Sequence, residues 1–311
     1  MGLLTLLAAA ALAAAPTNAA DLPVRIGQGN TALHGALVRP EGRAAPAAVL
    51  IVPGSGPSDR DGDDRKSFEH ARTYWYLAQA LAQQGIVTLR YDKRGTAESA
   101  GAGDAASIWD TVDEAAGWAR VLARQPGVRC VVALGHSEGA LIAALMAQKV
   151  RLCGLVSVSG SGRDLGSLIE AQTVMLHVAP DVAAQIQAAI QAERAGQPIP
   201  AVPKGYDSVF GPKAEPYNRS EISLDPAAEL AKVKAPVLVI QGDNDVQVKV
   251  EDAQRLAAAA HVQPQIIPGM NHVLKLAPKD VRGNFMTYMN PSLPLAPGVA
   301  EAVTAFVLER R

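Results

Sequence analysis

The sequence predicts an α/β protein with a doubly wound, mostly parallel sheet covered by helices on both faces. Three observations support this prediction. Short apolar runs recur along the chain, longer helical patterns separate them, and glycine or proline stands at many of the junctions. Strands that alternate with helices form parallel sheets. Apolar runs without a polar face are typical of strands buried on both sides, as strands are in such sheets.

The composition indicates an ordered globular protein. The chain has 311 residues, of which 49% are hydrophobic and 19% are charged, and these values are ordinary for folded domains. Its 29 basic and 30 acidic side chains leave a net charge of -1. With no excess of positive charge, nucleic acid and acidic membrane surfaces are not expected partners. The length fits two domains or one large domain with an insertion.

The N-terminal segment is expected to be a signal peptide. Residues 2–15 are apolar, and this run is too short to cross a hydrocarbon core of about 30 Å. The small residues that follow fit a cleavage site near Ala19 or Ala20. We therefore predict a signal peptide at residues 1–20, no stable membrane anchor, and a periplasmic or secreted protein. No Lys or Arg precedes the apolar run, so a disordered segment or a helix of the fold is the alternative.

The first part of the core is expected at residues 21–161. Its apolar runs predict strands at residues 24–27, 31–38, 46–53, 86–91, 130–135 and 153–159. The intervening patterns predict helices at residues 67–84, 105–125 and 138–148. Tyr74, Leu77 and Leu81 form one stripe of the first helix, and Gly85 ends it.

The alternation of strands and helices stops at residues 162–223 and resumes at residues 224–311. The interrupting segment predicts helices at residues 164–178 and 180–195, followed by a stretch broken by proline and glycine at 197–217. The second part of the core predicts strands at residues 235–242 and 263–268 and helices at 250–260 and 299–309. The chain is therefore expected to form one sheet domain that carries an insertion.

Residues 135–139, Gly-His-Ser-Glu-Gly, fit the G-x-S-x-G pattern of a nucleophile elbow. The pentapeptide stands between a predicted buried strand and a predicted helix, which is the context that such an elbow needs. Its glycines permit a sharp turn that exposes the Ser137 hydroxyl. An ordinary turn between strand and helix is the alternative.

A serine hydroxyl needs a base, and the base needs an orienting acid. Of six histidines, only His272 is expected on a loop at the carboxyl end of a strand, so we assign it as general base and then acid. The acid should come from the loop after the preceding strand, where Asp243 and Asp245 both occur. We prefer Asp245 because two more residues carry it away from the strand end.

An attacked carbonyl becomes an oxyanion that needs N–H donors. The amide of Glu138 is one candidate, because it follows the nucleophile at a helix N-terminus. The amide of Ser55 in the loop after residues 46–53 is the other. A phosphate cradle is excluded there, because no Lys follows the glycines as Walker A requires.

The same loop holds Asp59, Asp61, Asp63 and Asp64. Their spacing does not match a calcium loop, so they are expected to be solvated or paired with Arg60 and Arg65, and no metal is predicted. Residues 92–95, Asp-Lys-Arg-Gly, follow another predicted strand. We expect them to form an ion-paired turn at the wall of the cleft, with no catalytic role.

The two cysteines, Cys130 and Cys153, each open a predicted strand. If these strands are adjacent and in matched register, the Cα atoms lie about 5 Å apart, which allows a disulfide. Two buried thiols are the alternative.

The motifs at residues 53–61, 91–95, 135–139, 242–245 and 271–272 together resemble the α/β-hydrolase superfamily, in particular exported bacterial serine hydrolases named serine aminopeptidase-like or carboxylesterase. The resemblance covers nearly all of the mature chain. It implies about eight strands, a triad of Ser137, Asp245 and His272, and a cap formed by residues 162–223. Pro53 departs from the His-Gly that often opens the oxyanion loop in this superfamily.

The triad chemistry supports acyl transfer to water. We expect hydrolysis of small carboxylic esters with short to medium acyl chains and no cofactor. An aminopeptidase or amidase, a thioesterase and a non-catalytic binding protein are the alternatives, and the oligomeric state is left open. Apolar residues of the insertion form either an acyl pocket or its own packing surface: Leu168, Ile169, Val174, Met175, Leu176, Ile186 and Ile190. Glu170, Glu193 and Glu215 are available there to hold a substrate amine.

Overall fold

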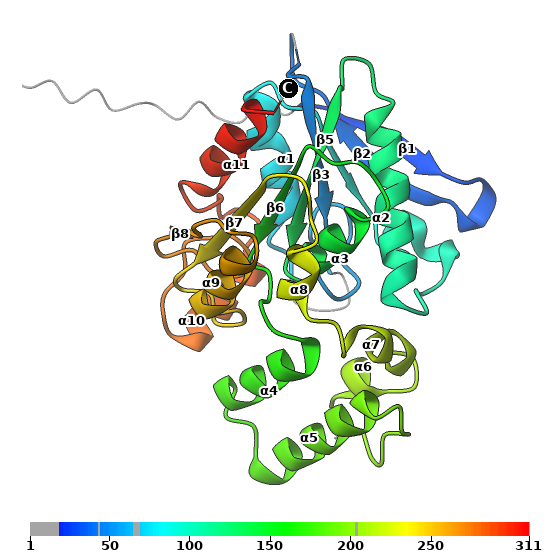
Figure 1. Ribbon diagram of the computed structural model, residues 1–311, viewed down its shortest axis with the longest axis vertical. Helices are drawn as coiled ribbons and strands as arrows, with labels where there is room; N and C mark the ends of the chain where they lie inside the picture. The colour runs from blue at the N-terminus through cyan, green and yellow to red at the C-terminus, as the bar shows by residue number, and fades with distance from the viewer. Residues whose placement is uncertain (1–18, 43, 65–68, 203–204, 311) are drawn as a thin grey trace, which may run out of the picture.

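The predicted α/β class is confirmed by a computed structural model, which describes residues 19–42, 44–64, 69–202 and 205–310. Eight strands form one sheet in the order β1-β2-β4-β3-β5-β6-β7-β8 (Figure 1). Their bounds are β1 Asp21–Ile26, β2 Leu33–Val38, β3 Ala47–Val52, β4 Thr88–Tyr91, β5 Cys130–His136, β6 Gly154–Val158, β7 Val237–Gly242 and β8 Gln265–Ile267.

The sheet is parallel from β4 to β8 and antiparallel only at one edge. Strand β3 pairs in parallel with β4 and β5, and β5, β6, β7 and β8 continue the parallel series. Strands β1 and β2 form an antiparallel hairpin beside β4. All six residues of β3 are buried, as expected of a strand that is covered on both faces. The carboxyl ends of β3 to β8 therefore lie along one edge of the sheet.

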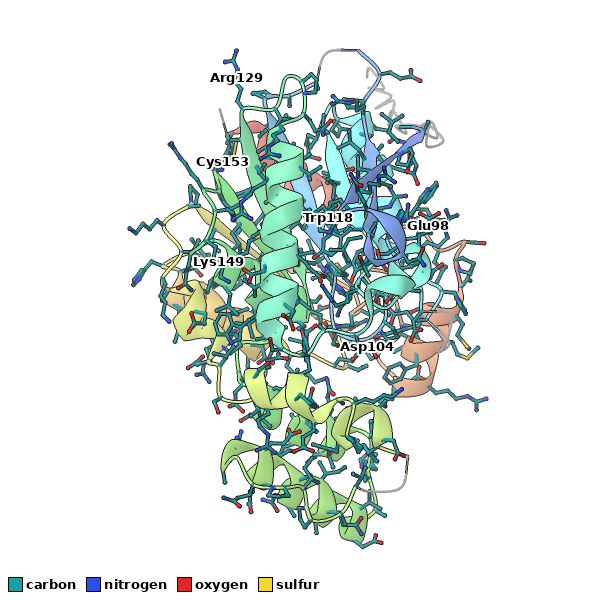
Figure 2. The ribbon with its side chains drawn as sticks, turned by 90° about the vertical axis from the view of Figure 1, so that its right-hand side faces the viewer. Glu98, Asp104, Trp118, Arg129, Lys149 and Cys153 are labelled. Carbon is teal, nitrogen blue, oxygen red and sulfur yellow. A yellow bond between two sulfur atoms is a disulfide. The ribbon has the colours of Figure 1, made fainter. Side chains whose placement is uncertain are left out.

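Two hydrophobic cores lie on opposite faces of the sheet. One core joins the strands to α2, α3, α8 and α9, and the other joins them to α1 and α11. These helices are α1 Thr73–Gln83, α2 Ile108–Ala123, α3 Glu138–Met146, α8 Pro226–Leu230, α9 Val250–Ala259 and α11 Val299–Leu308. The buried Trp118 of α2, labelled in Figure 2, lies on one of these faces. Its ring stacks on that of Tyr91 at the end of β4, with ring centroids 5.5 Å apart.

The insertion, residues 162–223, is helical and leaves the core between β6 and α8 (Figure 1). Its helices are α4 Leu165–Met175, α5 Pro180–Arg194, α6 Asp207–Phe210 and α7 Glu215–Glu221. A small apolar cluster of its own includes Ile186, Ile190, Phe210 and Ile222. It lies beyond the carboxyl ends of the strands, because side chains of α4 and α7 line the same pocket as Ser137.

Several element bounds differ from the sequence-based expectations. Helix α1 begins at Thr73 rather than at residue 67, because the backbone of Arg72 before it has a left-handed conformation. Residues 65–68 lie outside the described ranges. The stretch 197–217 was expected to be broken, but it contains α6 and the start of α7. Helix α10 Val281–Met286 and the short 3-10 helices η1 Gly29–Thr31, η2 Ala97–Ala102 and η3 Thr287–Met289 were not predicted. Segments this short give no helical periodicity to detect.

A disulfide joins Cys130 in β5 to Cys153 just before β6, with the Cα atoms 5.7 Å apart. The strands are adjacent and parallel, as the pairing requires, but Cys153 lies one residue out of register, opposite Val131 rather than Cys130.

The predicted signal peptide falls almost entirely on residues 1–18, which lie outside the described residues. Ala19 and Ala20 are described, and the backbone of Ala19 exchanges two hydrogen bonds with the Gln79 side chain. In the part of the chain that the structure describes, no helix combines the length and apolarity that a membrane crossing requires.

Candidate active site

Ser137 stands at a strained turn between β5 and α3. Its backbone has φ 55° and ψ -125°, a conformation that costs free energy in an L-residue. The flanking glycines make the turn possible: a Cβ on Gly135 would lie 2.1 Å from the Gly139 carbonyl oxygen, and one on Gly139 would lie 2.3 Å from the Val52 oxygen. The turn lifts the Ser137 side chain off the carboxyl end of β5, as the G-x-S-x-G pattern predicts.

Ser137, His272 and Asp245 form a continuous hydrogen-bonded row. The Ser137 Oγ lies 3.1 Å from His272 Nε2, and His272 Nδ1 lies 2.8 Å from Asp245 Oδ2. Asp245 follows β7 and His272 follows β8, so neighbouring strands deliver both groups to one edge of the sheet. The alternative acid, Asp243, instead accepts the Gly269 amide at 2.6 Å. The structure therefore places Asp245, not Asp243, beside the imidazole.

The carboxylate of Asp245 accepts four hydrogen bonds. Its Oδ1 accepts the amides of Gln247 and Val248 at 2.8 and 2.9 Å, and its Oδ2 accepts Gln241 Nε2 at 3.0 Å as well as His272 Nδ1. Burial raises the pKa of Asp245, but the neighbouring His272 and these donors outweigh burial and hold the pKa below its usual value. The group is thus kept as an anion that orients the imidazole.

The pKa of His272 is raised above its ordinary value. Burial lowers it, but the adjacent Asp245 carboxylate, with a smaller contribution from Glu69, outweighs burial. Burial in turn raises the pKa of Glu69 to about 7. His272 can therefore accept a proton from Ser137 more readily than an isolated histidine could.

A second histidine, His136, links the backbone of His272 to the loop after β3. Since a carbonyl only accepts, His136 Nε2 donates to the His272 oxygen at 2.7 Å. Its Nδ1 then accepts the Tyr74 hydroxyl at 3.0 Å, and the Tyr74 oxygen accepts the Gly54 amide at 2.9 Å. Burial lowers the pKa of His136 to about 3, so the ring stays neutral as this chain of hydrogen bonds requires.

The two predicted oxyanion donors lie beside Ser137. Ser55, Ser137 and Glu138 line one pocket. Glu138 opens helix α3, where an amide has no partner inside the helix. In the described residues, the Ser55 amide donates to no protein acceptor. Both N–H groups are thus available to a ligand oxygen.

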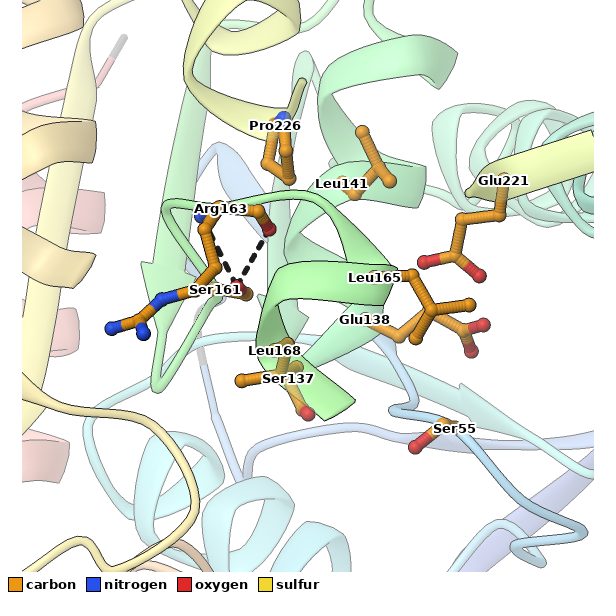
Figure 3. A pocket seen from close by; sticks show the side chains of 10 residues that line it. All are labelled: Ser55, Ser137, Glu138, Leu141, Ser161, Arg163, Leu165, Leu168, Glu221 and Pro226. Carbon is orange, nitrogen blue, oxygen red and sulfur yellow. Dashed lines mark hydrogen bonds between the residues drawn. The ribbon is translucent and has the colours of Figure 1, made fainter. Parts of the chain in front are cut away.

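The pocket is a partly open hollow of about 460 Å³, a volume that includes its solvent-filled mouth, and it lies between the core and the insertion (Figure 3). Leu141, Leu165, Leu168 and Pro226 give it an apolar wall. Among the insertion's apolar residues that were candidates for an acyl pocket, only Leu168 lines it. Ile186 and Ile190 are buried within the insertion, with Ile169 packed against them, and Val174 and Leu176 are exposed.

Sequence reasoning missed three charged residues near Ser137, and one of them is Arg163, which lines the pocket and pairs with Asp252. Glu221 of α7 lines the pocket, whereas the expected Glu170, Glu193 and Glu215 do not. Burial, together with contact with Glu138, raises the pKa of Glu221 well above its usual range. Lys93 lies 2.8 Å from the Gly54 oxygen and 3.3 Å from Glu138 Oε2. Lys93 is the second residue after β4. This position could have indicated a role in the site, because ligands bind at the carboxyl ends of parallel strands.

The acidic loop after β3 is organised by internal bonds. Asp59 accepts the amides of Asp61 and Asp63, and Asp61 pairs with Arg90. The predicted pairing of Arg60 within this loop is wrong, because Arg60 binds Asp92 and Glu98 instead. Arg65 lies outside the described residues. Over the described ranges, no cluster of three or more His, Cys, Asp and Glu side chains is arranged to hold a metal ion.

The sheet order, the strained turn that carries Ser137 and the helical insertion after β6 are those of the α/β-hydrolase fold. A family model described as serine aminopeptidase, S33, matches residues 67–202. Esterase EstD of Thermotoga maritima is 26% identical over 249 residues, which are 78% of this chain and 58% of that protein. The chain thus matches little more than half the length of that relative.

Solved structures share the fold over nearly the whole chain. Est1E from Butyrivibrio proteoclasticus has a TM-score of 0.55 at 17% identity and covers 92% of this chain and 96% of its own. An alpha-beta serine hydrolase homologue from Coxiella burnetii has a TM-score of 0.51 at 16% identity and covers 93% and 96%. At such identities the likeness concerns the fold alone. The chain therefore has the α/β-hydrolase fold, and its residues 67–202 are similar to the serine aminopeptidase, S33, family.

Proposed function

We propose that the protein is a serine hydrolase that cleaves carboxylic esters with short to medium acyl chains. The observation that carries the proposal is the row from Ser137 Oγ through His272 to Asp245, with contacts of 3.1 and 2.8 Å. A buried, oriented imidazole within reach of a half-buried serine that lines a pocket is the arrangement that activates a hydroxyl nucleophile. The similarity to an esterase from Thermotoga maritima supports the same class of reaction.

In the proposed acylation step, Ser137 Oγ attacks the ester carbonyl while His272 Nε2 takes its proton. The carbonyl oxygen becomes an oxyanion that accepts hydrogen bonds from the Ser55 and Glu138 amides. His272 then gives the proton to the leaving alkoxide, and the alcohol departs. Asp245 stabilises the imidazolium that exists between these two transfers.

Deacylation repeats the sequence with water. His272 removes a proton from a water molecule, whose oxygen attacks the acyl carbonyl. The tetrahedral intermediate collapses and its bond to Ser137 Oγ breaks. Ser137 Oγ takes the proton that His272 removed from water, and the carboxylic acid is released. The row of residues needs no cofactor for these steps.

The side chains that line the pocket favour a short acyl group. Leu141, Leu165 and Leu168 offer apolar contact, while Glu138 and Glu221 bring carboxyl groups into the same space. We infer that the insertion acts as a cap, since α4 and α7 contribute to this pocket. A long acyl chain would meet polar groups within it, which favours short chains over long ones.

A second candidate function is an aminopeptidase or amidase. The observation that favours it is the pair of carboxyl groups of Glu138 and Glu221 in the pocket, whose oxygens could accept hydrogen bonds from a substrate ammonium. The family model that matches residues 67–202 carries the name serine aminopeptidase. Comparing turnover of aminoacyl arylamides with that of p-nitrophenyl esters separates the two functions.

We propose that the protein is exported, with cleavage near Ala19 or Ala20. The Cys130–Cys153 disulfide supports this proposal, because such bonds persist in oxidising compartments. The intact mass and N-terminal sequence of the protein recovered from its natural host test it. A protein that retains residues 1–18 and remains in the reducing cytoplasm would contradict it.

The test of the reaction class combines labelling with a substrate panel. A fluorophosphonate probe is expected to label Ser137, and p-nitrophenyl esters from acetate to octanoate are expected to show a maximum at short to medium length. Failure to label Ser137 would favour a binding protein on the same scaffold. Faster turnover of arylamides than of esters would favour the second candidate function.

A further inference from the structure

Lys93 touches both segments that supply the proposed oxyanion donors. Its Nζ donates to the Gly54 oxygen at 2.8 Å and lies 3.3 Å from Glu138 Oε2. The side chain is only 14% exposed. Gly54 precedes the Ser55 amide in the loop after β3, and Glu138 supplies the other amide at the start of α3. One ammonium group therefore joins the two sides of the oxyanion site.

The contact with the Gly54 oxygen fixes the direction of the Ser55 amide. The described residues contain no cis peptide bond, and in a planar trans peptide the C=O and the following N–H point in opposite directions. Since the Gly54 carbonyl points at Lys93, the Ser55 N–H points away from Lys93. Rotation of this peptide would both break the bond to Lys93 and turn the donor elsewhere.

The oxyanion loop has few other restraints at this point. Ser55 and Gly56 are exposed, and Gly56 has φ +80°. On the other side of Gly54, its amide donates to the Tyr74 hydroxyl at 2.9 Å. Tyr74 and Lys93 thus hold the two peptide units that flank Gly54. Among the described residues, Lys93 is the only one that hydrogen-bonds to the peptide unit that contains the Ser55 donor.

The turn that contains Lys93 is anchored without it. Asp92 pairs with Arg60, and Arg94 pairs with Glu114 and donates to the Ala102 oxygen. The sequence predicts an ion-paired turn at residues 92–95 with no catalytic role. The structure separates Lys93 from that role. Asp92 contacts the loop after β3 at Arg60, whereas the Lys93 side chain contacts Gly54 of that loop and Glu138 of α3 together.

We propose that Lys93 is a positioning residue of the oxyanion site: its ammonium group holds the Gly54–Ser55 peptide so that the Ser55 amide meets the transition-state oxygen. This proposal rests on the proposed hydrolase function. Lys93 does not touch the reacting atoms, and its effect is to keep a donor in place. A donor displaced by about 1 Å can reduce a rate by about 100-fold.

The test compares Lys93→Met, Lys93→Arg and Lys149→Met with the wild-type protein. Methionine keeps most of the side-chain volume but donates no hydrogen bond, whereas arginine keeps the charge and donors. Lys149→Met is the matched control, because Lys149 pairs with the exposed Asp113 and does not line the pocket that holds Ser137. Measurements are kcat and KM for p-nitrophenyl butyrate, their pH dependence, and inhibition by butylboronic acid, which forms a tetrahedral adduct on serine.

Lys93→Met is expected to lower kcat by about 10- to 100-fold and to change KM by less than about threefold, because the donor matters mainly in the transition state. Binding of the boronic acid should weaken by a similar factor. The acid limb of the pH profile should not move, since Lys93 makes no contact with His272. Lys93→Arg should recover part of kcat, and Lys149→Met should behave as wild type.

The outcomes separate this proposal from the proposed function. If Ser137→Ala abolishes activity but Lys93→Met leaves kcat and boronic acid binding unchanged, the hydrolase function stands and the role of Lys93 is overturned. A rise in KM with unchanged kcat overturns it as well, since Lys93 would then hold the substrate. A wild-type protein that hydrolyses no ester and is not labelled at Ser137 overturns both.

Discussion

At the scale of single residues, the geometry separates two aspartates that the sequence presents as near equals. Asp245 accepts four hydrogen bonds, one of them from His272, whereas Asp243 accepts the Gly269 amide at the surface. The sequence could place both on the right loop, because an acid is expected after the strand that precedes the histidine. The choice depends on how the loop turns, and this turn is set by the Gln247 and Val248 amides that bind Asp245.

Asp245→Asn is expected to lower kcat by about 10⁴-fold without unfolding the protein, because an amide would favour the wrong tautomer of His272. Steady-state kinetics with a short p-nitrophenyl ester measures this effect. Asp243→Asn is the matched control and should keep kcat within about threefold of wild type. A larger loss in Asp243→Asn than in Asp245→Asn would contradict the assignment.

The pH dependence of kcat/KM should report His272. The imidazole acts as a base only when neutral, so activity should rise with pH and its midpoint should lie above the ordinary histidine value of about 6.5. Glu69→Gln removes a negative charge that raises the pKa of His272, so this variant should move the midpoint to lower pH. His136 should contribute nothing near neutrality, because its pKa is lowered to about 3. A midpoint below that of free histidine would contradict this account.

At the scale of elements, the predictable helices are the long ones. Helices α4 and α5 were expected from their length and composition, and Asp164 begins α4 by accepting the Ser167 amide. Helices α6 and α7 contain four and seven residues, too few to show a period. Glu221 was missed for this reason: it occupies the end of α7, and only the packing of that helix brings it to the pocket.

Helix α5 carries a buried carboxyl group that should make the stability of the protein depend on pH. Glu193 is 2% exposed, and neither of its oxygens has a hydrogen-bond partner in the described part of the chain. Burial raises the pKa of Glu193 to about 7 from its ordinary value of 4.5. The folded chain therefore binds this proton more tightly than the unfolded chain, and the free energy of unfolding should fall as pH rises between these values.

Glu193→Gln removes this titration, so the variant should be more stable than wild type at pH 8, and the advantage should shrink toward pH 4. Urea unfolding at both pH values measures the difference. Glu170→Gln, a partly exposed glutamate of the same insertion, is the matched control and should show no such pH-dependent gain. Equal unfolding midpoints for wild type and Glu193→Gln at pH 8 would contradict the prediction.

At the scale of the whole molecule, the sequence was most informative where strands are buried on both faces. The continuous apolar runs predicted β3, β5 and β6 closely, and the alternation predicted a parallel sheet. The order of the strands and the antiparallel pairing of β1 and β2 with the edge required tertiary contacts. No local sequence pattern predicts which strands become neighbours in the sheet.

The site was predictable because the topology brings loops together that are far apart in sequence. Ser137, Asp245 and His272 each follow a strand of the parallel series, so one edge of the sheet collects them. Lys93 follows β4 at the same edge, yet its role was not predicted, because a lysine beside charged neighbours favours a surface ion pair. The contact with Gly54 depends on the path of the loop after β3.

The central claim is that Ser137 is the nucleophile of an ester hydrolase. Its most direct test is the turnover of p-nitrophenyl acetate and butyrate by the wild-type protein and by Ser137→Ala, with circular dichroism to show that the variant is folded. Loss of the nucleophile should lower kcat by on the order of 10⁶-fold, to the background rate. Wild-type turnover retained in folded Ser137→Ala would contradict the claim.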